Sequence, residues 1–355
     1  MLLIDCSAMK DHRYIRWWAI RVTAVAILIG IPLAGFEILV EYLLRNPAAL
    51  RFMPEPVSVA VTRIYNHRDR IQINMDPKCS RFDEQVLYTL RPGQCRFTNR
   101  EFDTHFRINS AGLRDEEEAL VAPDVIFLGD SYTMGWGVEQ DEAFPQRVAR
   151  ATGLKTLNTG ITSYGTVRET LVFEKLDRSN LKFVVLQYGE NDYAENEFFA
   201  RHGKLRPGDK KRFDRLARKA ARNTRYFPFK YIYSVLRISL GTILQSAPPP
   251  TPNQEVDALM PLLRRIAQAA GNVPVLVFDY RPSRNRHQRF NDALAARLAG
   301  DSTLGRSIKI IDVAADLKAD ETFILDDHWT VRGHAVVAAG LARHIANPPS
   351  SQGTR

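Results

Sequence analysis

The chain has 355 residues, of which 45% are hydrophobic and 25% are charged. This composition can supply the core of one large α/β domain with additional segments, and it excludes a generally disordered protein. The net charge is +9, but residues 201–237 hold thirteen Lys/Arg and two acidic residues, which give +11, so the rest of the chain sums to −2. The basic character therefore belongs to one segment.

The first predicted element is an apolar segment over residues 22–40, in which Glu37 is the only charged residue. About twenty apolar residues span a bilayer as a helix, and aromatic side chains favour its two interfaces. Basic residues before the span keep that end in the cytoplasm. The flanking aromatic residues are Trp17, Trp18 and Tyr42, and the basic residues are Lys10, Arg13, Arg16 and Arg21.

These features predict a cytoplasmic tail over residues 1–21 and an uncleaved transmembrane anchor over residues 22–43. A cleaved signal peptide is disfavoured, because its short charged start and small-residue cleavage site are not clear here. A buried core helix would suit Glu37 and Pro32, but the length and the flanks favour the anchor. We expect a single-pass protein of a bacterial inner membrane, with the remainder on the periplasmic or extracellular side.

Residues 44–118 are predicted to be a membrane-proximal connecting region with short strands, since they contain several prolines and no sustained hydrophobic period. Residues 102–117 are expected to form a strand or hairpin that leads into the main domain. Cys79 and Cys95 allow two interpretations. A disulfide between them would add about 3 kcal/mol in an oxidising compartment, and two reduced thiols are the alternative.

Residues 119–346 alternate between apolar strand-like runs and helical patterns, which predicts an α/β domain with a parallel sheet covered by helices on both faces. Ligands bind outside the carboxyl ends of the strands in such sheets. A tail over residues 347–355 ends the chain. The expected strands are residues 125–128, 155–160, 182–189, 273–280 and 308–313, and the expected helices are 144–153, 167–176, 255–271, 291–300 and 332–345.

A basic insert over residues 193–253 interrupts this alternation and ends in a Pro-rich linker. Its basic part is followed by an aromatic and aliphatic run over residues 226–244. One interpretation is an interfacial membrane helix attracted to anionic lipid headgroups. The other is a helical flap over the active site with a solvated basic face. Nucleic acid is not an expected partner in the predicted compartment.

Small and polar residues follow the first three strands of the predicted sheet. Ser131 comes after the first, where a serine is often only a helix N-cap. Residues 158–160 (Asn-Thr-Gly) follow the second and residues 189–192 (Gly-Glu-Asn-Asp) the third, and single residues of these types are common in turns. In a parallel sheet all three points meet at one edge. A glycine N–H and an asparagine amide there suit a developing oxyanion, which favours Ser131 as a nucleophile.

The sequence LDDHWTVRGH at residues 325–334 supplies a candidate base. The imidazole of His328 can take a proton from a serine hydroxyl, and a carboxylate can hold the required tautomer. A solvated acidic loop is one alternative, and a metal site made by Asp326, Asp327 and His328 is another. No second His or Cys cluster accompanies these residues in the sequence, so we expect no metal.

The blocks GDSY, NTG, GEND and DDHW resemble, in order and spacing, the four blocks of the SGNH (GDSL-type) hydrolases. The resemblance covers roughly residues 119–346 without the insert and implies a flavodoxin-like three-layer α/β/α sandwich. With the predicted anchor, the chain resembles a membrane-anchored bacterial member of this family. It implies Ser131 as the nucleophile and His328 as the base. The oxyanion hole would comprise the N–H groups of Ser131 and Gly160 and the side chain of Asn191.

Two positions depart from the family pattern. Tyr132 replaces the usual leucine, and Leu325 stands three residues before the histidine, where the acid is usual. An Asp-x-His arrangement assigns the acid to Asp326, with Asp327 second because it would have to fold back to reach the ring. Asp130 is expected to brace the turn rather than to act in catalysis.

The predicted function is a serine esterase that hydrolyses O-acetyl or short acyl esters on a cell-envelope carbohydrate or lipid. The predicted mechanism is a Ser-His-Asp acyl-enzyme mechanism without a cofactor. An O-acyltransferase acting on an envelope polysaccharide would use the same acyl-enzyme and is the first alternative. A non-catalytic envelope assembly protein that retains the fold is the second.

Overall fold

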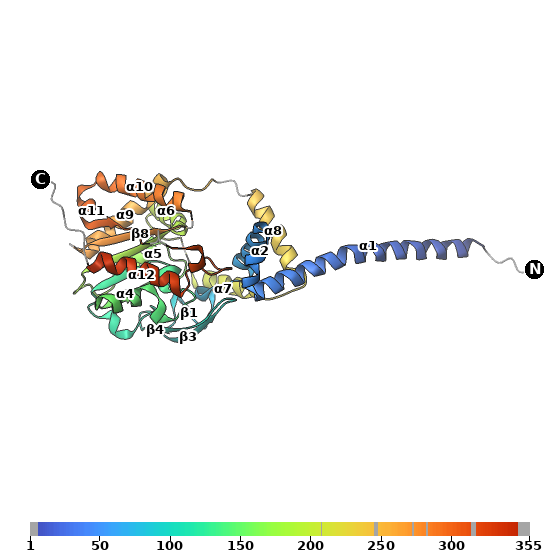
Figure 1. The fold of residues 1–355 in the computed structure, drawn as a ribbon, viewed down its shortest axis with the longest axis horizontal. Coiled ribbons are helices and arrows are strands. Elements are labelled where there is room, and N and C mark those ends of the chain that lie inside the picture. The colour runs from blue at the N-terminus through green and yellow to red at the C-terminus, as the bar shows by residue number, and fades with distance from the viewer. Residues whose placement is uncertain are drawn as a thin grey trace, which may run out of the picture. The chain divides into compact units, whose positions relative to one another are not determined.

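The computed structural model describes residues 6–206, 208–244, 248–271, 273–281, 283–313 and 317–346, so the predicted C-terminal tail lies outside the described residues. The chain folds into two compact units, and Figure 1 shows their elements. Unit 1 comprises residues 1–69 and 225–246. Unit 2 comprises residues 70–224 and 247–355.

Unit 2 contains a five-stranded parallel sheet in the order β6-β5-β7-β8-β9. β5, the first strand of this sheet in the chain, therefore lies inside the sheet between β6 and β7, while β8 and β9 extend the side of β7. The predicted strands and their parallel pairing are confirmed. The bounds are β5 (Val125–Leu128), β6 (Thr156–Asn158), β7 (Phe183–Gly189), β8 (Val275–Tyr280) and β9 (Ile308–Ile310).

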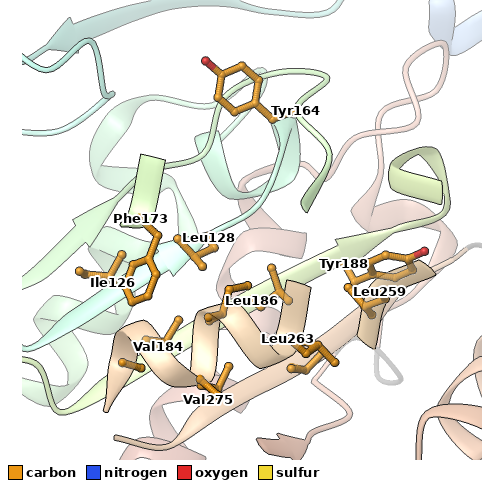
Figure 2. Close-up of a cluster of buried hydrophobic side chains, with 14 of the residues drawn as sticks. Ile126, Leu128, Tyr164, Phe173, Val184, Leu186, Tyr188, Leu259, Leu263 and Val275 are labelled. Carbon is orange, nitrogen blue, oxygen red and sulfur yellow. The ribbon is translucent and has the colours of Figure 1, made fainter. Parts of the chain in front are cut away.

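Successive residues of each strand point to opposite faces of this sheet, and both faces are apolar. Ile126 and Leu128 lie in one hydrophobic cluster, while Val125 and Phe127 lie in another. All four side chains are fully buried. Figure 2 shows the first cluster, in which Phe173 packs beside Ile126 and Leu128.

Helices cover both faces, which gives the predicted three-layer α/β/α arrangement (Figure 1). The first face packs against α5 (Thr166–Phe173), α9 (Pro252–Ala270) and α10 (Arg284–Ala299). The second packs against α4 (Phe144–Thr152) and α12 (Val331–Ala346). The chain also has two short α-helices, α3 (Ser131–Met134) and α11 (Ser302–Ser307), and a π-helical turn at Tyr65–Asp69. Its 3-10 turns lie at Pro47–Phe52, Ile73–Met75, Glu117–Leu120, Gln140–Glu142, Glu190–Asp192 and Ala319–Glu321.

Two helices begin earlier than their apolar pattern predicts. α9 starts at Pro252, inside the predicted linker, because the Thr251 hydroxyl accepts the N–H of Gln254 at 3.3 Å and proline suits the first helical turn. α10 starts at Arg284, seven residues before the predicted start, because its first turns are polar and show no hydrophobic period.

Residues 70–118 form two antiparallel hairpins, in the region where the sequence predicts short strands. The first pairs β1 (Ser80–Asp83) with β2 (Leu87–Leu90), and the second pairs β3 (Gly93–Thr98) with β4 (Asp103–Ile108), which confirms the strand expected there. Cys79 and Cys95 form a disulfide with a Cα–Cα distance of 5.4 Å. The hairpin side chains share a hydrophobic cluster with residues just after Ser131. Its members include Phe97, Phe106, Met134 and Trp136.

The basic insert does not form one structural element. α6 (Tyr193–His202) and the basic helix α7 (Lys210–Thr224) belong to unit 2, whereas α8 (Lys230–Leu244) belongs to unit 1. The basic stretch and the aromatic stretch therefore have different surroundings, although they are adjacent in the sequence.

Unit 1 is built from α1 (Cys6–Arg45), α2 (Glu55–Ile64) and α8. α1 begins at Cys6, in the predicted tail, rather than at residue 22. Every side chain over residues 14–36 is exposed. Among the described residues, one helix, over Tyr14–Arg45, is long and apolar enough to cross a membrane.

Glu37, the charge inside the apolar segment, caps another helix of unit 1. Its Oε1 accepts the backbone N–H groups of Tyr231 at 2.9 Å and Ile232 at 2.8 Å, at the start of α8. These donors have no partner within their own helix, and a carboxylate at a helix N-terminus is electrostatically favourable. Close by in the chain, the buried pair of Lys230 and Asp69, 2.5 Å apart, joins α8 to the turn after α2. The charge in the apolar segment thus has a structural role.

Candidate active site

Ser131 lies at the carboxyl edge of the sheet, as the first residue of α3 directly after β5. The turn before it is tight, because Gly129 has φ of 154° and a Cβ there would lie 2.1 Å from the Thr133 hydroxyl. Asp130, not Ser131, is the N-cap: its Oδ1 accepts the Tyr132 N–H at 3.0 Å. The hydroxyl of Ser131 is therefore not used for capping, and the expectation that Asp130 braces the turn is confirmed.

The structure brings His328 to this serine from the other end of the domain. Nε2 of His328 lies 2.6 Å from Oγ of Ser131, and both residues are buried. Two aromatic rings from the segment after β5 hold the imidazole. Trp136 stacks on it with centroids 4.8 Å apart, and Tyr132 lies at 4.6 Å. The ring orientation is thus fixed by packing as well as by hydrogen bonds.

Asp326 contacts the opposite nitrogen of the same ring. Its Oδ1 meets Nδ1 of His328, and its Oδ2 accepts the indole N–H of Trp136 at 3.1 Å. Burial by itself raises the pKa of Asp326, but His328, Arg70 and the Trp136 N–H together hold that pKa well below its usual range. Asp326 is therefore an ionised, buried partner that favours the tautomer with its proton on Nδ1.

Asp327 occupies a different environment. Its side chain is 59% exposed and pairs with Arg70 at 2.9 Å, and its backbone carbonyl accepts the Tyr132 hydroxyl at 2.8 Å. Its Oδ1 lies 3.3 Å from Nδ1 of His328, farther than the Asp326 carboxylate. The geometry favours Asp326 over Asp327 as the partner of the imidazole.

Asp326, Asp327 and His328 also offer ligand atoms within 4.8 Å of one another, as a metal site would require. Both ring nitrogens of His328 are already engaged, with Ser131 on one side and Asp326 on the other. The described geometry therefore fits proton transfer between Ser131 and His328 better than metal coordination.

The two further residues expected in an oxyanion hole lie beside the turn that carries Ser131. Nδ2 of Asn191 donates to Oδ2 of Asp130 at 3.0 Å, which leaves the second hydrogen of this amide for another acceptor. Gly160 packs so closely under α3 that a Cβ would lie 2.2 Å from the Met134 nitrogen. Its N–H donates to Oδ1 of Asn158 at 3.0 Å. A role for Gly160 as an oxyanion donor stays a prediction, and it requires this hydrogen bond to open.

A comparison with family models decides the class of the protein. Residues 127–336 match the GDSL-like Lipase/Acylhydrolase family. The chain belongs to this family. The match spans the sheet from β5 onward and includes every residue of the predicted site, so the protein is an SGNH-type hydrolase. No curated protein sequence matches the chain.

Solved structures similar to this GDSL-like hydrolase include three carbohydrate esterases. A family two carbohydrate esterase from Clostridium thermocellum in complex with cellohexaose has 12% identity, coverage of 64% of each chain and a TM-score of 0.40. A family 3 carbohydrate esterase from the same organism has 13% identity, coverage of 62% of this chain and 94% of that one, and a TM-score of 0.38. An acetyl xylan esterase from Butyrivibrio proteoclasticus has 12% identity, 64% coverage of each chain and a TM-score of 0.38.

Several residues of this GDSL-like site were not expected from the sequence. Trp136, Arg70 and Glu101 all contact the segment that carries Asp326, yet none lies at the end of a sheet strand. Ser163 was also missed: it is exposed, has φ of 60° and lines a pocket of about 590 Å³ together with Asn191. Only Trp136, five residues after Ser131, is close enough in the chain for local reasoning to have suggested it.

Proposed function

We propose that this GDSL-like hydrolase is a serine esterase that removes an O-acetyl or short acyl group from a cell-envelope carbohydrate or lipid. One observation carries the proposal: Nε2 of His328 lies 2.6 Å from Oγ of Ser131 while Nδ1 faces the buried Asp326. This is the arrangement that an ester-attacking serine requires. Ser131 is the nucleophile, His328 the general base and Asp326 the acid of the triad.

The reaction begins when Nε2 of His328 takes the hydroxyl proton of Ser131 and Oγ bonds to the ester carbonyl carbon. The tetrahedral intermediate collapses as the carbon–oxygen bond to the alcohol breaks, and His328 returns the proton to the leaving oxygen. Water then attacks the acyl-enzyme with His328 again as the base, which releases the acid and regenerates Ser131. Asp326 stabilises the imidazolium in both half-reactions.

The negative charge on the carbonyl oxygen needs hydrogen-bond donors during both steps. We assign this role to the N–H of Ser131, the amide of Asn191 and the N–H of Gly160. Asn191 has a spare hydrogen beyond the one donated to Asp130. Removing one such donor costs on the order of 10²–10³ in rate.

We further propose that the protein is anchored by α1 in a bacterial inner membrane, with its N terminus in the cytoplasm and the hydrolase domain on the periplasmic or extracellular side. The exposed apolar surface over residues 14–36 and the basic residues before it support this orientation. The disulfide between Cys79 and Cys95 also supports it, because such bonds persist in oxidising compartments.

We propose that α8 contacts lipid together with α1, and that α7 does not. Large apolar side chains are exposed on α8 and just before it, namely Tyr226, Phe227, Phe229, Tyr233, Leu236 and Leu240. No large apolar side chain is exposed on α7 over Lys210–Thr224. An interfacial helix needs such side chains to enter the acyl boundary, so α8 is the better membrane helix of the two.

The test of the reaction uses the full chain in detergent and a short-chain p-nitrophenyl ester. Ser131→Ala should abolish hydrolysis and labelling by a fluorophosphonate, whereas Ser179→Ala, an exposed serine outside the site, should retain both. Full activity of Ser131→Ala would refute the mechanism. Failure of the wild-type protein to label would support a non-catalytic role instead.

Whether water or a sugar hydroxyl accepts the acyl group is tested separately, with an acyl donor and an envelope glycan in the same reaction. An esterase releases free acetate, and an O-acyltransferase moves acetyl to sugar hydroxyls. Mass spectrometry of the glycan distinguishes the two products. Transfer to sugar at a rate above hydrolysis would replace the esterase proposal with the acyltransferase one.

A further inference from the structure

The pocket of about 590 Å³ beside Asn191 is lined by both polar and apolar residues. Four segments of unit 2 form its walls: the turn between β1 and β2, the loop after β6, the start of α6, and the segment that leads into α7. Three arginines and two glutamates contribute, so the lining carries one net positive charge, and Arg168 pairs with Glu195. The lining residues that carry the argument are Arg168, Arg206, Arg212, Glu84, Glu195 and Asn191.

This pocket shares one residue, Asn191, with the proposed active site. Asn191 lines it and donates to Asp130 at 3.0 Å, and Asp130 directly precedes Ser131 in the chain. Ser163 enters the lining from the loop after β6. A ligand in the pocket therefore lies against Asn191, one of the three residues proposed to bind the carbonyl oxygen.

A second hollow of about 500 Å³ continues along α7. It shares Gly208 and Arg212 with the first pocket, and its wall adds one cation, Arg215, and one carboxylate, Asp209. We call the two hollows together the arginine groove, defined by Arg168, Arg206, Arg212 and Arg215. The groove leads from Asn191 along the basic helix α7, an extent that suits a polymeric ligand.

The arginines differ in how they are held. Arg168 pairs with Glu195 and lies over the rings of Tyr88 and Tyr164, but its Nη1 is buried without a hydrogen-bond partner. Arg206 lies over the ring of Phe198 at 5.1 Å. A guanidinium group supported by a ring retains its fork of donors, which matches a carboxylate in a bidentate manner.

A lipid surface fits this groove poorly. Phe213, the aromatic residue of α7, is buried against Phe82 with ring centroids 6.3 Å apart, so it is not available for membrane insertion. The cations line a concave surface together with Glu84 and Glu195, which can accept hydrogen bonds from hydroxyl groups. Mixed acceptors and cations suit a ligand with both hydroxyl and carboxylate groups.

We propose that the arginine groove binds an anionic glycan whose sugars carry carboxylate groups, and that it presents an O-acylated sugar of this chain to Ser131. The inference deepens the proposed esterase function and rests on it for the reaction. The binding itself does not depend on the reaction, which allows the two to be tested apart.

The experiment measures binding of de-esterified oligogalacturonate to the full chain in neutral detergent by calorimetry. This probe carries carboxylates but no ester, so its binding does not require catalysis. The double variant Arg206→Gln/Arg215→Gln removes two groove cations. Arg218→Gln is the matched control, because Arg218 is exposed on the same helix and lines neither hollow.

We expect the double variant to weaken oligogalacturonate binding by about tenfold or more, as the loss of charge-assisted hydrogen bonds implies, and Arg218→Gln to change it by less than about twofold. Neutral xylo-oligosaccharide of equal length should bind the wild-type protein at least about tenfold more weakly. Raising NaCl from about 0.05 M to about 0.5 M should weaken binding of the anionic probe only.

Equal affinity for the neutral and anionic oligosaccharides would overturn the proposal, as would equal losses in the double variant and in Arg218→Gln. Loss of oligogalacturonate binding when phosphatidylglycerol is added to the micelles would assign the arginines to lipid headgroups and also overturn it. If the anionic probe binds as expected but wild-type protein fails to label with a fluorophosphonate, the groove stands and the esterase function fails.

Discussion

The carboxylate of Glu101 holds the backbone of Asp326, whose N–H donates to Oε2 at 3.0 Å. The same carboxylate accepts the N–H groups of Ile324 at 2.7 Å and Leu325 at 2.8 Å. Burial raises the pKa of Glu101, and the three N–H donors offset only part of that effect. Glu101, in the turn between β3 and β4, therefore positions the segment that places Asp326 against His328.

Replacement of Glu101 by Gln should lower kcat for p-nitrophenyl acetate by about tenfold or more, with KM changed by less than about twofold, because a small displacement of the triad acid affects the transition state most. Gln keeps the size but replaces one acceptor oxygen with a donor, so the three N–H groups are no longer all satisfied. Glu118→Gln, at an exposed glutamate, is the control. An unchanged kcat at an unchanged melting temperature would remove Glu101 from the positioning role.

The two adjacent aspartates make a direct test of the triad assignment. Asp326→Asn should lower kcat by as much as about 10⁴-fold, because the amide favours the wrong tautomer of His328. Asp327→Asn should lower kcat by less than about fivefold, because that side chain is 59% exposed. The hydrogen bond from Tyr132 goes to the backbone carbonyl of residue 327, which the substitution keeps. Steady-state hydrolysis of p-nitrophenyl acetate compares the two. The reverse order of effects would assign the acid to Asp327.

The main features of the site could be predicted because they follow from strand order. Parallel strands bring their carboxyl ends to one edge, so Ser131 and Asn191 could be placed together from local patterns alone. Glu101 and Trp136 reach Asp326 through hairpin packing, and no local pattern encodes which hairpin covers which strand end. The hydrogen bond from the Gly160 N–H to the Asn158 side chain could not be predicted from the sequence either, because it depends on the exact path of one turn.

The insert shows a second limit of prediction from sequence. The basic and aromatic stretches are adjacent in the chain, which favours one element, but α7 packs on the β1–β2 hairpin of unit 2 and α8 belongs to unit 1. Glu37, like Pro32, suits a buried core helix better than an anchor when only the sequence is considered. Its partners at Tyr231 and Ile232 lie almost 200 residues away in the chain, and periodicity cannot reveal a cap over that distance.

The disulfide between Cys79 and Cys95 should stabilise the hairpin region. The two residues are 16 apart in sequence, and a cross-link over a loop of this size contributes about 3 kcal/mol. Cys79→Ser/Cys95→Ser should therefore lower the melting temperature of the full chain, as should reduction of the wild-type protein with dithiothreitol. Dithiothreitol should have no further effect on the double variant. Equal melting temperatures for both proteins under oxidising conditions would contradict the stabilising role.

His334 should make the stability of unit 2 fall in mild acid. Burial lowers the pKa of His334 to about 3, and the charge of Arg114 adds to this effect. In the unfolded chain the pKa returns to about 6.5, so between these values the unfolded state binds a proton that the native state does not. The stability that neutral, buried His334 contributes is fully present above about pH 6.5 and is lost as the pH falls toward 3. In this range the free energy of unfolding falls by up to about 1.4 kcal/mol per pH unit.

His334→Asn isolates this contribution, because Asn keeps an acceptor for the Phe144 N–H, which now donates to Nδ1 of His334 at 3.3 Å, but does not titrate. Urea unfolding of the full chain in detergent, between about pH 4.5 and pH 7, should show a steeper loss of stability for the wild-type protein than for the variant. This range avoids most of the titration of Asp326, whose lowered pKa affects stability only below the usual aspartate range. Parallel pH dependences for the two proteins would show that His334 is not the group responsible.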